Sequence, residues 1–401
     1  MDNINLQLLP LPEKFTKNYK NKILNSNFDK LITLYKGLYI KDNKILSQQK
    51  LGFDLNFYEK LKQTNQQNIK VTINKTCQEK ILKITQTDSL WFEKYLAEIL
   101  RENSRISSIE ILSVLLNPNL VVVVFDGEYN NPIKLSQILK NSNVKTEQAS
   151  TILLLVFKKN VKVNLVFDLQ IQDILFLNFV GFLEQNAEVI LQNFISLEAK
   201  DIVFVCQRWF LEAAARLEQS ANIISSGKFI NTQNYLLNGA KAQVVNYNKL
   251  LLSKNARVSF FVNQIHRSIF TNSYAQVKSI AGDTSNLSSQ GYIFIDKDGE
   301  ESKAEQRHDV LLLSPHALVS AQPALEVKTK KVQCKHGSAI AKISDEQLWY
   351  LKSRGLNDLE SKKFLLRAFL NLEDVALNHT IWLNTLDSIV NNVYRNEINE
   401  T

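Results

Sequence analysis

The sequence contains very few cysteines. Among 401 residues there are only three, Cys77, Cys206 and Cys334. An odd and widely spaced set does not supply the disulfide framework of a small secreted domain, so we expect a reducing compartment. Three distant thiols also exclude a zinc or iron–sulfur site that would need four cysteines of this chain alone.

Long apolar runs are missing as well. The longest ones, such as Leu120–Phe125 and Ile152–Phe157, are far shorter than the roughly 20 residues of a membrane-spanning helix. Residues 1–11 do not show the basic and then apolar order of a secretory signal. We therefore expect a soluble, cytoplasmic protein.

The sequence motifs of common nucleotide-binding and hydrolytic enzymes do not occur. The fragment nearest to a phosphate-binding P-loop is Gly227-Lys228, but Phe229 follows it and Asn222 stands in place of the first glycine. The chain should therefore not bind ATP through a P-loop. The glycine motif of dinucleotide-binding proteins, the histidine pair of zinc proteases and the nucleophile elbow are also missing. These absences predict a protein without catalytic activity.

Charge of neither sign dominates strongly. The chain has 48 Lys and Arg against 40 Asp and Glu, a formal net charge of +8. The basic residues are spread along the sequence and are densest at Lys158-Lys159 and at residues 328–331. We interpret them as a solvated lysine-rich surface, and nucleic-acid binding ranks behind the other functions considered below.

What the sequence does contain divides it into three regions. Residues 1–110 are rich in Lys, Asn and Gln and favour a helical N-terminal domain, although the stretch from Lys62 to Lys80 leaves its structure open. The clearest helix is predicted for residues 89–100, where apolar side chains recur at helical spacing. Residues 111–343 form a predicted β-rich core, and residues 344–401 are predicted to be helical again.

The predicted core is a series of short β-type runs. They are Val121–Phe125, Ile152–Phe157, Val161–Phe167, Ile202–Cys206, Gln243–Val245, Val258–Val262, Tyr292–Ile295, Val310–Leu313, Leu325–Val327 and Val332–Cys334. Turn residues such as Asn238-Gly239 separate them. Apart from a predicted turn or two of helix at Glu212–Glu218, no helical pattern intervenes, which argues against a doubly wound α/β fold.

Three architectures can hold so many short strands. A propeller should show a repeated blade motif, which is not visible, and a sandwich should be shorter and alternate more cleanly. A β-helix tolerates irregular coil lengths, because each coil contacts only its neighbours. The pattern favours the β-helix without deciding the question.

The C-terminal region carries clear helix boundaries. Ser344 begins a capping-box pattern that Gln347 completes, and Gly355 stands at the position that commonly ends a helix. Asn357 begins a second helix that contains an apolar stripe including Phe364. We predict a third helix from Thr380 to about Arg395.

One pair of residues suggests metal chemistry. Cys334 and His336 are two positions apart, so a strand would direct both side chains to the same face. A thiolate and a neutral imidazole are good ligands for iron or zinc, but two ligands do not complete a tetrahedral site. The spacing alone favours a structural interpretation, a buried thiol beside a partly exposed histidine.

The remaining histidines and cysteines give weaker signals. His308 precedes Asp309 and is interpreted as its ion-pair partner, whereas His266 ends a strand and is a minor functional candidate. His316 lies in a predicted turn, and His379 stands beside a predicted helix cap. Cys206 is interpreted as a core thiol.

Three linked segments resemble a known family. They are Pro323-Ala-Leu-Glu-Val327, then Val332-Gln-Cys-Lys-His-Gly-Ser-Ala339, then Ser344-Asp-Glu-Gln-Leu-Trp-Tyr-Leu-Lys-Ser-Arg-Gly355. In this order and spacing they are similar to motifs of the SufB/SufD family of iron–sulfur cluster assembly proteins. The Cys-x-His-Gly form and the chain length resemble the SufD branch more than the SufB branch, although Lys335 and Ser338 depart from the usual motif.

The resemblance implies a fold and partners. The fold would be a right-handed parallel β-helix flanked by N-terminal and C-terminal helical domains. The β-helix would pair with SufB, and the C-terminal helices would receive the ATPase SufC, with Trp349, Tyr350, Arg354 and Phe364 as candidate docking residues. The resemblance also leaves open a homodimer of the isolated chain.

The resemblance gives the Cys-x-His pair a role as well. His336 would be an iron or cluster ligand at the SufB interface, with Cys334 beside it. ATP would be bound by SufC, and the nascent cluster would be shared with SufB. The resemblance leaves open whether a flavin (FAD) associates with the complex. A β-helix enzyme acting on polysaccharides is an alternative, which should show Asp, Arg and Lys clustered on successive coils.

Overall fold

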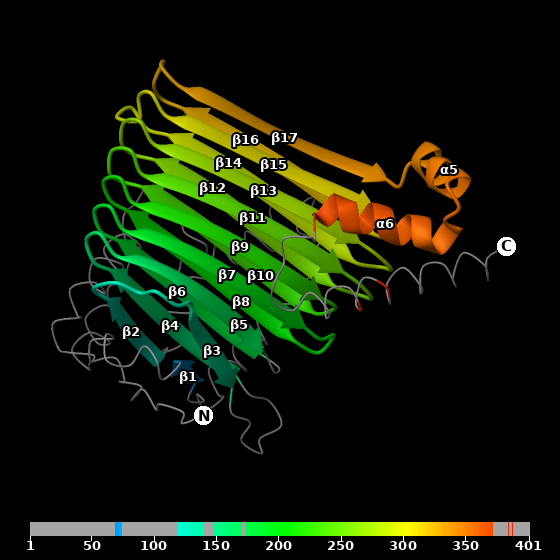
Figure 1. Ribbon diagram of the computed structural model, residues 1–401, viewed down its shortest axis with the longest axis horizontal. Helices are drawn as coiled ribbons and strands as arrows, with labels where there is room; N and C mark the ends of the chain where they lie inside the picture. The colour runs from blue at the N-terminus through cyan, green and yellow to red at the C-terminus, as the bar shows by residue number, and fades with distance from the viewer. Residues whose placement is uncertain are drawn as a thin grey trace, which may run out of the picture.

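The computed structural model describes residues 69–73, 119–139, 148–170 and 174–371, together with Asn384 and Asp387. Within these ranges the chain winds into two facing sheets of long strands, followed by two helices, one of which packs against a sheet (Figure 1). None of the helices in the described ranges is long and apolar enough to cross a membrane.

Successive strands alternate between the two sheets. The even sheet has eight strands in the order β16-β14-β12-β10-β8-β6-β4-β2, and the odd sheet has nine in the order β1-β3-β5-β7-β9-β11-β13-β15-β17. The even strands are β2 (Asn119–Phe125), β4 (Gln148–Phe157), β6 (Ile174–Leu183), β8 (Ile202–Leu211), β10 (Lys228–Leu237), β12 (Arg257–His266), β14 (Asn286–Ile295) and β16 (Leu318–Val327). The odd strands are β1 (Ile69–Ile73), β3 (Ile133–Leu139), β5 (Lys162–Gln170), β7 (Glu188–Leu197), β9 (Arg216–Ser225), β11 (Gln243–Leu252), β13 (Asn272–Ala281), β15 (Lys303–Leu312) and β17 (Gln333–Lys342).

This arrangement is a parallel β-solenoid. All pairs from β2 onward are parallel, and only β1 pairs antiparallel, with β3. Each coil contributes one strand to each sheet and stacks on the next in flush register, as where Lys228–Leu237 pairs with Arg257–His266 along its whole length. The β-helix expected from the resemblance is therefore confirmed.

The turns after the even strands from β2 to β14 each contain a left-handed residue. Asn160 and Asn186 have φ angles of 62° and 60°, and the amide of Asn186 donates to Asn160 at 2.9 Å. Asparagine tolerates this conformation better than most residues. A small buried residue then follows, such as Ala187 or Ala215, because the coil turns sharply against its neighbour at this point.

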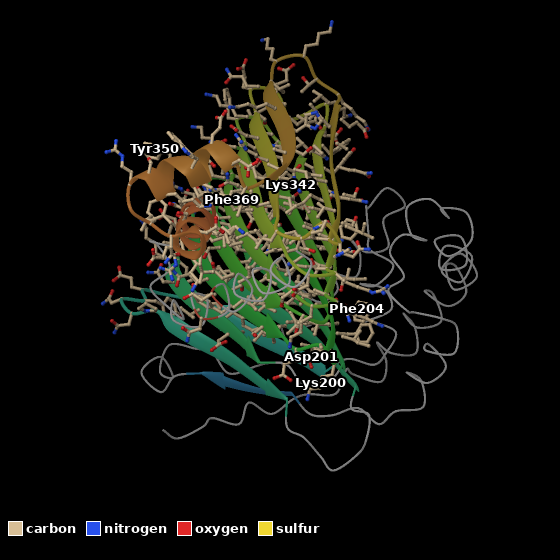
Figure 2. The ribbon with its side chains drawn as sticks, turned by 90° about the vertical axis from the view of Figure 1, so that its right-hand side faces the viewer. Lys200, Asp201, Phe204, Lys342, Tyr350 and Phe369 are labelled. Carbon is tan, nitrogen blue, oxygen red and sulfur yellow. The ribbon has the colours of Figure 1, made fainter. Side chains whose placement is uncertain are left out.

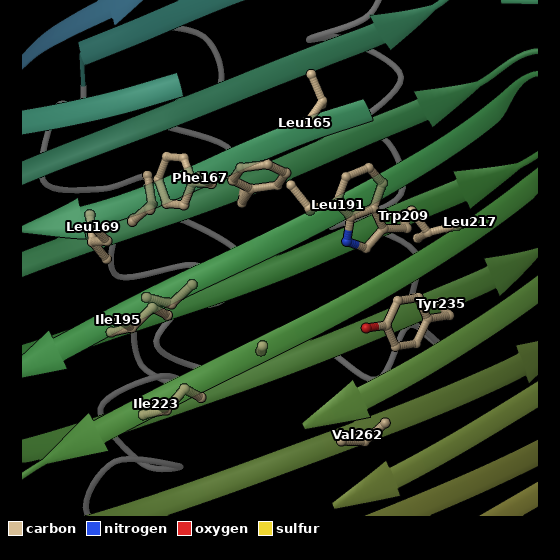
Figure 3. Close-up of a cluster of buried hydrophobic side chains, with 14 of the residues drawn as sticks. Leu165, Phe167, Leu169, Leu191, Ile195, Trp209, Leu217, Ile223, Tyr235 and Val262 are labelled. Carbon is tan, nitrogen blue, oxygen red and sulfur yellow. The ribbon is translucent and has the colours of Figure 1, made fainter. Parts of the chain in front are cut away.

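The interior of the lower coils, which we define as β2 to β7, is mainly apolar. Phe125 and Phe157 stack at 4.8 Å between ring centroids, and Leu155, Leu165 and Leu191 are fully buried beside them. Figure 3 shows such side chains lying between the two sheets. Burying each large apolar side chain contributes about 1.5–3 kcal/mol, so this end supplies much of the stability.

The coil formed by β8 and β9 is a transition. Trp209 is fully buried and lies on Gly181 of the coil below, where an added Cβ would come within 2.1 Å of the indole ring. One pleat away on β8, Gln207 accepts a hydrogen bond from Gln219 at 2.7 Å. Only glycine at position 181 leaves room for the indole. Trp209 thus lies at the boundary between the apolar and the polar part of the interior.

The upper coils, β10 to β17, hold a polar network inside. Gln233 donates to Asn248 at 2.9 Å and accepts from Asn246 at 2.7 Å. The Tyr235 hydroxyl donates to Gln219 and lies 3.2 Å from Gln233, and burial raises the pKa of Tyr235. Buried amides are stable only when they are hydrogen-bonded, so these side chains depend on each other.

Two helices follow the last strand. The first, α5 (Asp345–Ser353), begins at Ser344, whose side chain accepts from the Gln347 amide, and ends before Gly355 with a φ of 97°. The second, α6 (Asp358–Leu370), begins with a capping box between Asn357 and Glu360. These boundaries agree with those predicted from the sequence.

The helix α6 covers part of the outer face of the odd sheet. Its Leu366 and Leu370 are fully buried and pack with Leu251 and Ile280 of that sheet. Lys249 adds a hydrogen bond from its ammonium group to the carbonyl oxygen of Asn371 at 2.6 Å. The helix pair is thereby fixed to the upper coils (Figures 1 and 2).

One prediction for the core is wrong. The predicted turn of helix at Glu212–Glu218 is instead a tight turn followed by β9. Leu217, Gln219 and Ala221 are buried while Arg216, Glu218 and Ser220 between them are not, which is a strand period. The polar residues between them resemble a helix surface, but they lie on the strand's outer face or in the polar interior.

Several predictions fall on other parts of the chain. The N-terminal helical region lies outside the described residues, apart from β1, which falls in the stretch from Lys62 to Lys80 that had been left open. The third C-terminal helix also lies outside them, apart from Asn384 and Asp387, which are helical.

Candidate ligand and partner site at the open end of the solenoid

The last coil, β16 and β17, leaves both sheets open. Among the described strands, each of these two pairs on one side only, so its other edge presents backbone N–H and C=O groups along ten residues. Figure 1 shows this coil at the end of the solenoid away from β1. An open edge of this kind is a template for strand pairing unless another structure covers it.

Apolar side chains are exposed on this coil. The exposed fraction is 59% for Leu318, 46% for Ile340, 38% for Leu325 and 36% for Val327. Their counterparts one coil below on the interior side, such as Ile293 and Ile295, are fully buried. Leu318 lies on the outer face, whereas the other three side chains occupy positions that face the interior in the coil below.

Cys334 and His336 both face the interior side of β17. Their register partners on β15 are Ala304 and Gln306, which point inward, whereas Lys335 between them points outward and pairs with Glu305 at 2.8 Å. Parallel strands in register direct paired residues to the same face. The thiol and the imidazole are therefore on one face at the mouth of the solenoid, in the relation that their spacing predicts.

The two side chains differ in their surroundings. Cys334 is half-buried and packs against Ile293, Ile295 and Ala304, and this burial raises the pKa of its thiol. His336 is exposed. Within the described residues no group of three or more His, Cys, Asp or Glu side chains could hold a metal ion. Any metal at the mouth would thus require further ligands.

Two interior residues lie one coil below, on β15. Gln306 is the register partner of His336, and His308 is the partner of Ser338. His308 is fully buried, and its Nδ1 lies 2.5 Å from the Ser289 hydroxyl. Burial lowers the pKa of His308 to about 4, so its imidazole is neutral at pH 7. The predicted pairing of His308 with Asp309 is wrong, because Asp309 points outward and accepts from Arg307 at 2.7 Å.

His266 is a second buried histidine, and both of its ring nitrogens are satisfied. Nδ1 lies 2.7 Å from the Thr271 hydroxyl, and Nε2 lies 2.8 Å from the Ser273 hydroxyl. Burial lowers its pKa to about 3. This geometry is that of a structural histidine at the end of a strand, and it leaves no lone pair or proton for a ligand.

The other residues singled out from the sequence lie apart from the mouth. His316 is exposed in a turn, Cys206 is buried in β8, and His379 and Cys77 lie outside the described residues. Sequence reasoning overlooked Gln306, and only the register of β15 against β17 could have identified it, because glutamine has no metal-binding signature.

The helix pair presents an aromatic surface. Trp349 is 72% exposed, and Tyr350 and Phe364 are also exposed. The guanidinium carbon of Arg354 lies 5.3 Å from the centroid of the Tyr350 ring. Figure 2 shows Tyr350 on the outward side of α5. Large apolar side chains exposed on a pair of helices commonly mark a protein–protein contact.

These features define a β-solenoid protein with an open terminal coil and an exposed aromatic helix pair. Residues 139–369, more than half of the chain, match the family model for the SufBD core domain of the SUF system of FeS cluster assembly. The chain therefore belongs to the SufB/SufD family of iron–sulfur cluster assembly proteins.

Individual relatives cover smaller parts of the chain. The iron–sulfur cluster assembly protein SufD of Escherichia coli is 31% identical over 104 residues, 26% of this chain and 25% of that protein. SufB of Bacillus subtilis is 22% identical over 184 residues, 45% of this chain and 40% of that protein. A SufBD family protein of Archaeoglobus fulgidus is 26% identical over 193 residues, 45% of this chain and 51% of that protein. The matches thus span between a quarter and about half of these relatives.

Proposed function

We propose that the chain is the SufD-type subunit of an iron–sulfur cluster assembly scaffold, acting through its partners and not as an enzyme. The observation that carries this proposal is the Cys334-Lys335-His336 strand at the open mouth of a family solenoid. The match to the SufD of E. coli supports the assignment to this branch. Iron or a nascent cluster is the cargo of such a scaffold and not a resident cofactor of this chain.

The open coil is the proposed contact with SufB. A solenoid is stable when each coil is covered by a neighbour, and the last coil here exposes two strand edges and several apolar side chains. A second family member would offer edges of the same kind. Pairing of edges would satisfy the exposed backbone groups of both chains and bury interior-facing residues such as Leu325 and Ile340.

The contact with SufB would also complete the ligand set. Cys334 and His336 supply two ligands on one face, so SufB would contribute the others across the interface. The raised pKa of Cys334 means that metal binding must displace its proton. We therefore infer that metal binding at the mouth weakens as the pH falls.

The helix pair is the proposed contact with the ATPase SufC. The contact would bury the exposed rings of Trp349, Tyr350 and Phe364. The guanidinium group of Arg354, which lies over the Tyr350 ring, would provide a positive charge at the same contact. Because the sequence carries no P-loop, ATP would be bound by SufC. Hydrolysis would then act on this chain mechanically, through α5 and α6 on the upper coils.

A SufB-type scaffold is the second candidate, because the match to the SufB of B. subtilis covers 45% of this chain. The two candidates differ in what they bind. A SufD-type subunit should form a mixed complex with a separate SufB, whereas a SufB-type chain should replace SufB in such a complex.

Co-purification of this chain with SufB and SufC tests the proposal. We expect a complex with both partners and loss of cluster formation, but not of the complex, for His336→Ala. The matched control is Lys335→Ala, because Lys335 is the neighbouring residue on the outer face. Failure of the wild-type chain to bind SufB, or normal cluster formation by His336→Ala, would contradict the proposal.

A further inference from the structure

Gln306 holds a buried acceptor without a donor. The residue is only 1% exposed and points into the solenoid from β15. Its Nε2 donates to the carbonyl oxygen of Val262, on β12 of the opposite sheet, at 3.0 Å. Its Oε1 is buried and has no hydrogen-bond partner within the described structure. Buried polar atoms are nearly always paired, so an acceptor of this kind calls for a donor.

The fold fixes the place of this amide. Gly291 of β14 lies across from it, and a Cβ at that position would lie 2.4–2.5 Å from the three end atoms of the Gln306 side chain. Glycine therefore makes room for the amide, while the Val262 carbonyl holds its nitrogen. The amide oxygen has a set position inside the solenoid, just below the open coil.

His336 is the residue directly above Gln306. The two are register partners on β17 and β15, and neighbouring strands are about 4.7–4.9 Å apart. Both face the interior, since Lys335 and Glu305 pair on the outer face. His308, two positions along β15, lies instead below Ser338, and its Nδ1 is held by Ser289. Gln306 is thus the interior acceptor aligned with His336.

We propose that Gln306 is a positioning residue for His336: its Oε1 accepts a hydrogen bond from one ring N–H of His336 and leaves the lone pair of the other ring nitrogen free for a metal ligand bond. Histidine ligands usually donate their second N–H to such an acceptor, which fixes the tautomer and the ring orientation. A neutral amide does this without stabilising the imidazolium form, as a carboxylate would. The lone pair of the other ring nitrogen of His336 is therefore left free for the ligand bond.

This inference rests on the ligand role proposed for His336, and it can be tested without any partner. The chain has five histidines, so selective ¹⁵N-histidine labelling of the full chain gives few signals, and His336→Ala assigns the one of interest. We expect a single tautomer for His336 in the wild-type chain and a mixture of both in Gln306→Met, which keeps the side-chain length but removes the acceptor. Gln306→Glu keeps an acceptor at this position and should therefore retain the single tautomer.

A metal titration gives the second readout. With Co²⁺ as probe, we expect Gln306→Met to weaken the His336-dependent binding about 10–100-fold and Gln306→Glu to restore it. His308→Asn is the matched control, because it changes the neighbouring interior residue and should leave the His336 tautomer unchanged. Unaltered signals of the other histidines report an intact fold.

The results separate this inference from the proposed function. The same tautomer mixture in the wild-type chain and in Gln306→Met would overturn the role of Gln306, whatever the chain binds. A single tautomer that depends on Gln306, in a chain that binds no SufB, would support the positioning role while the proposed function fails.

Discussion

The lower and upper coils share one backbone plan but differ in what fills them. Between β2 and β7 the interior is built mainly from Leu, Val and Phe, whereas between β10 and β17 it holds Gln, Asn, Ser and two histidines. Apolar packing is non-directional and tolerant, but a buried amide or imidazole must find a partner in a fixed place. The lower coils therefore provide stability, and the upper coils provide a fixed arrangement of polar groups that ends at the mouth.

The largest effect is expected where the two halves meet. Trp209→Ala should lower the free energy of unfolding by about 3–5 kcal/mol, because the indole fills the space between Phe157, Phe179 and Gly181. Chemical denaturation followed by circular dichroism measures this. Trp349→Ala is the matched control: with 72% exposure it should change stability by less than about 0.5 kcal/mol. Equal losses in the free energy of unfolding for the two variants would contradict a stabilising role of Trp209 at the boundary of the apolar coils.

A polar substitution tests the other side of the comparison. Gln233→Leu should cost about 2–3 kcal/mol, because it leaves the buried amides of Asn246 and Asn248 without their partner. The same denaturation experiment reports it. If leucine at this position stabilised the protein, the polar network would not be a structural requirement of the upper coils.

Acid should act on the upper coils first. Burial holds the pKa of His266 at about 3 and that of His308 at about 4, below the unfolded value of about 6.5. Between the folded and the unfolded pKa of each histidine, the unfolded chain binds more protons than the folded one. The stabilising contribution of each neutral histidine is therefore complete above pH 6.5, and the free energy of unfolding falls below it by about 1.4 kcal/mol per pH unit and histidine. Denaturation midpoints between pH 7.5 and 4.5 measure the slope, and His308→Asn should reduce it. An unchanged slope in that variant would rule out the contribution of His308.

The smallest effect concerns the turns. The lower coils place Asn160 and Asn186 at the left-handed position, whereas an upper coil places Lys241 there with a φ of 64°. Lys241→Gly should stabilise the protein by up to about 1 kcal/mol, and Asn186→Gly by less, because lysine is the more strained residue in this conformation. Thermal unfolding of both variants measures the two stabilisations. A larger stabilisation by Asn186→Gly than by Lys241→Gly would contradict the prediction.

Local features were predictable from the sequence to a large extent. The helix boundaries at Ser344, Gly355 and Asn357 follow from capping, which involves neighbours along the chain. Predicted runs such as Ile202–Cys206 covered only part of a strand, and β7 and β9 were not predicted at all. Polar residues such as Gln192 and Glu218 on the outer faces interrupt the apolar runs without ending the strands. The β-solenoid itself became definite only through the family resemblance.

The candidate site was predictable in part. The common face of Cys334 and His336 follows from a spacing of two on a strand. The place of Gln306 beneath His336 depends on the register between strands one coil apart, which a single sequence does not reveal. The polar interior was equally hidden, since residues such as Gln233 and Asn246 are typical of surfaces and here lie fully buried.

The flush stacking of the coils determines which coil can open locally. Each coil contacts only the coils next to it, so a coil in the middle is held from two sides and the last one from a single side. β16 and β17 can fray and close again without disturbing the coils beneath them, and a partner seated on them stops this motion. If the proposed partner covers this coil, the backbone that carries Cys334 and His336 should exchange its amide protons more slowly in the complex than in the isolated chain.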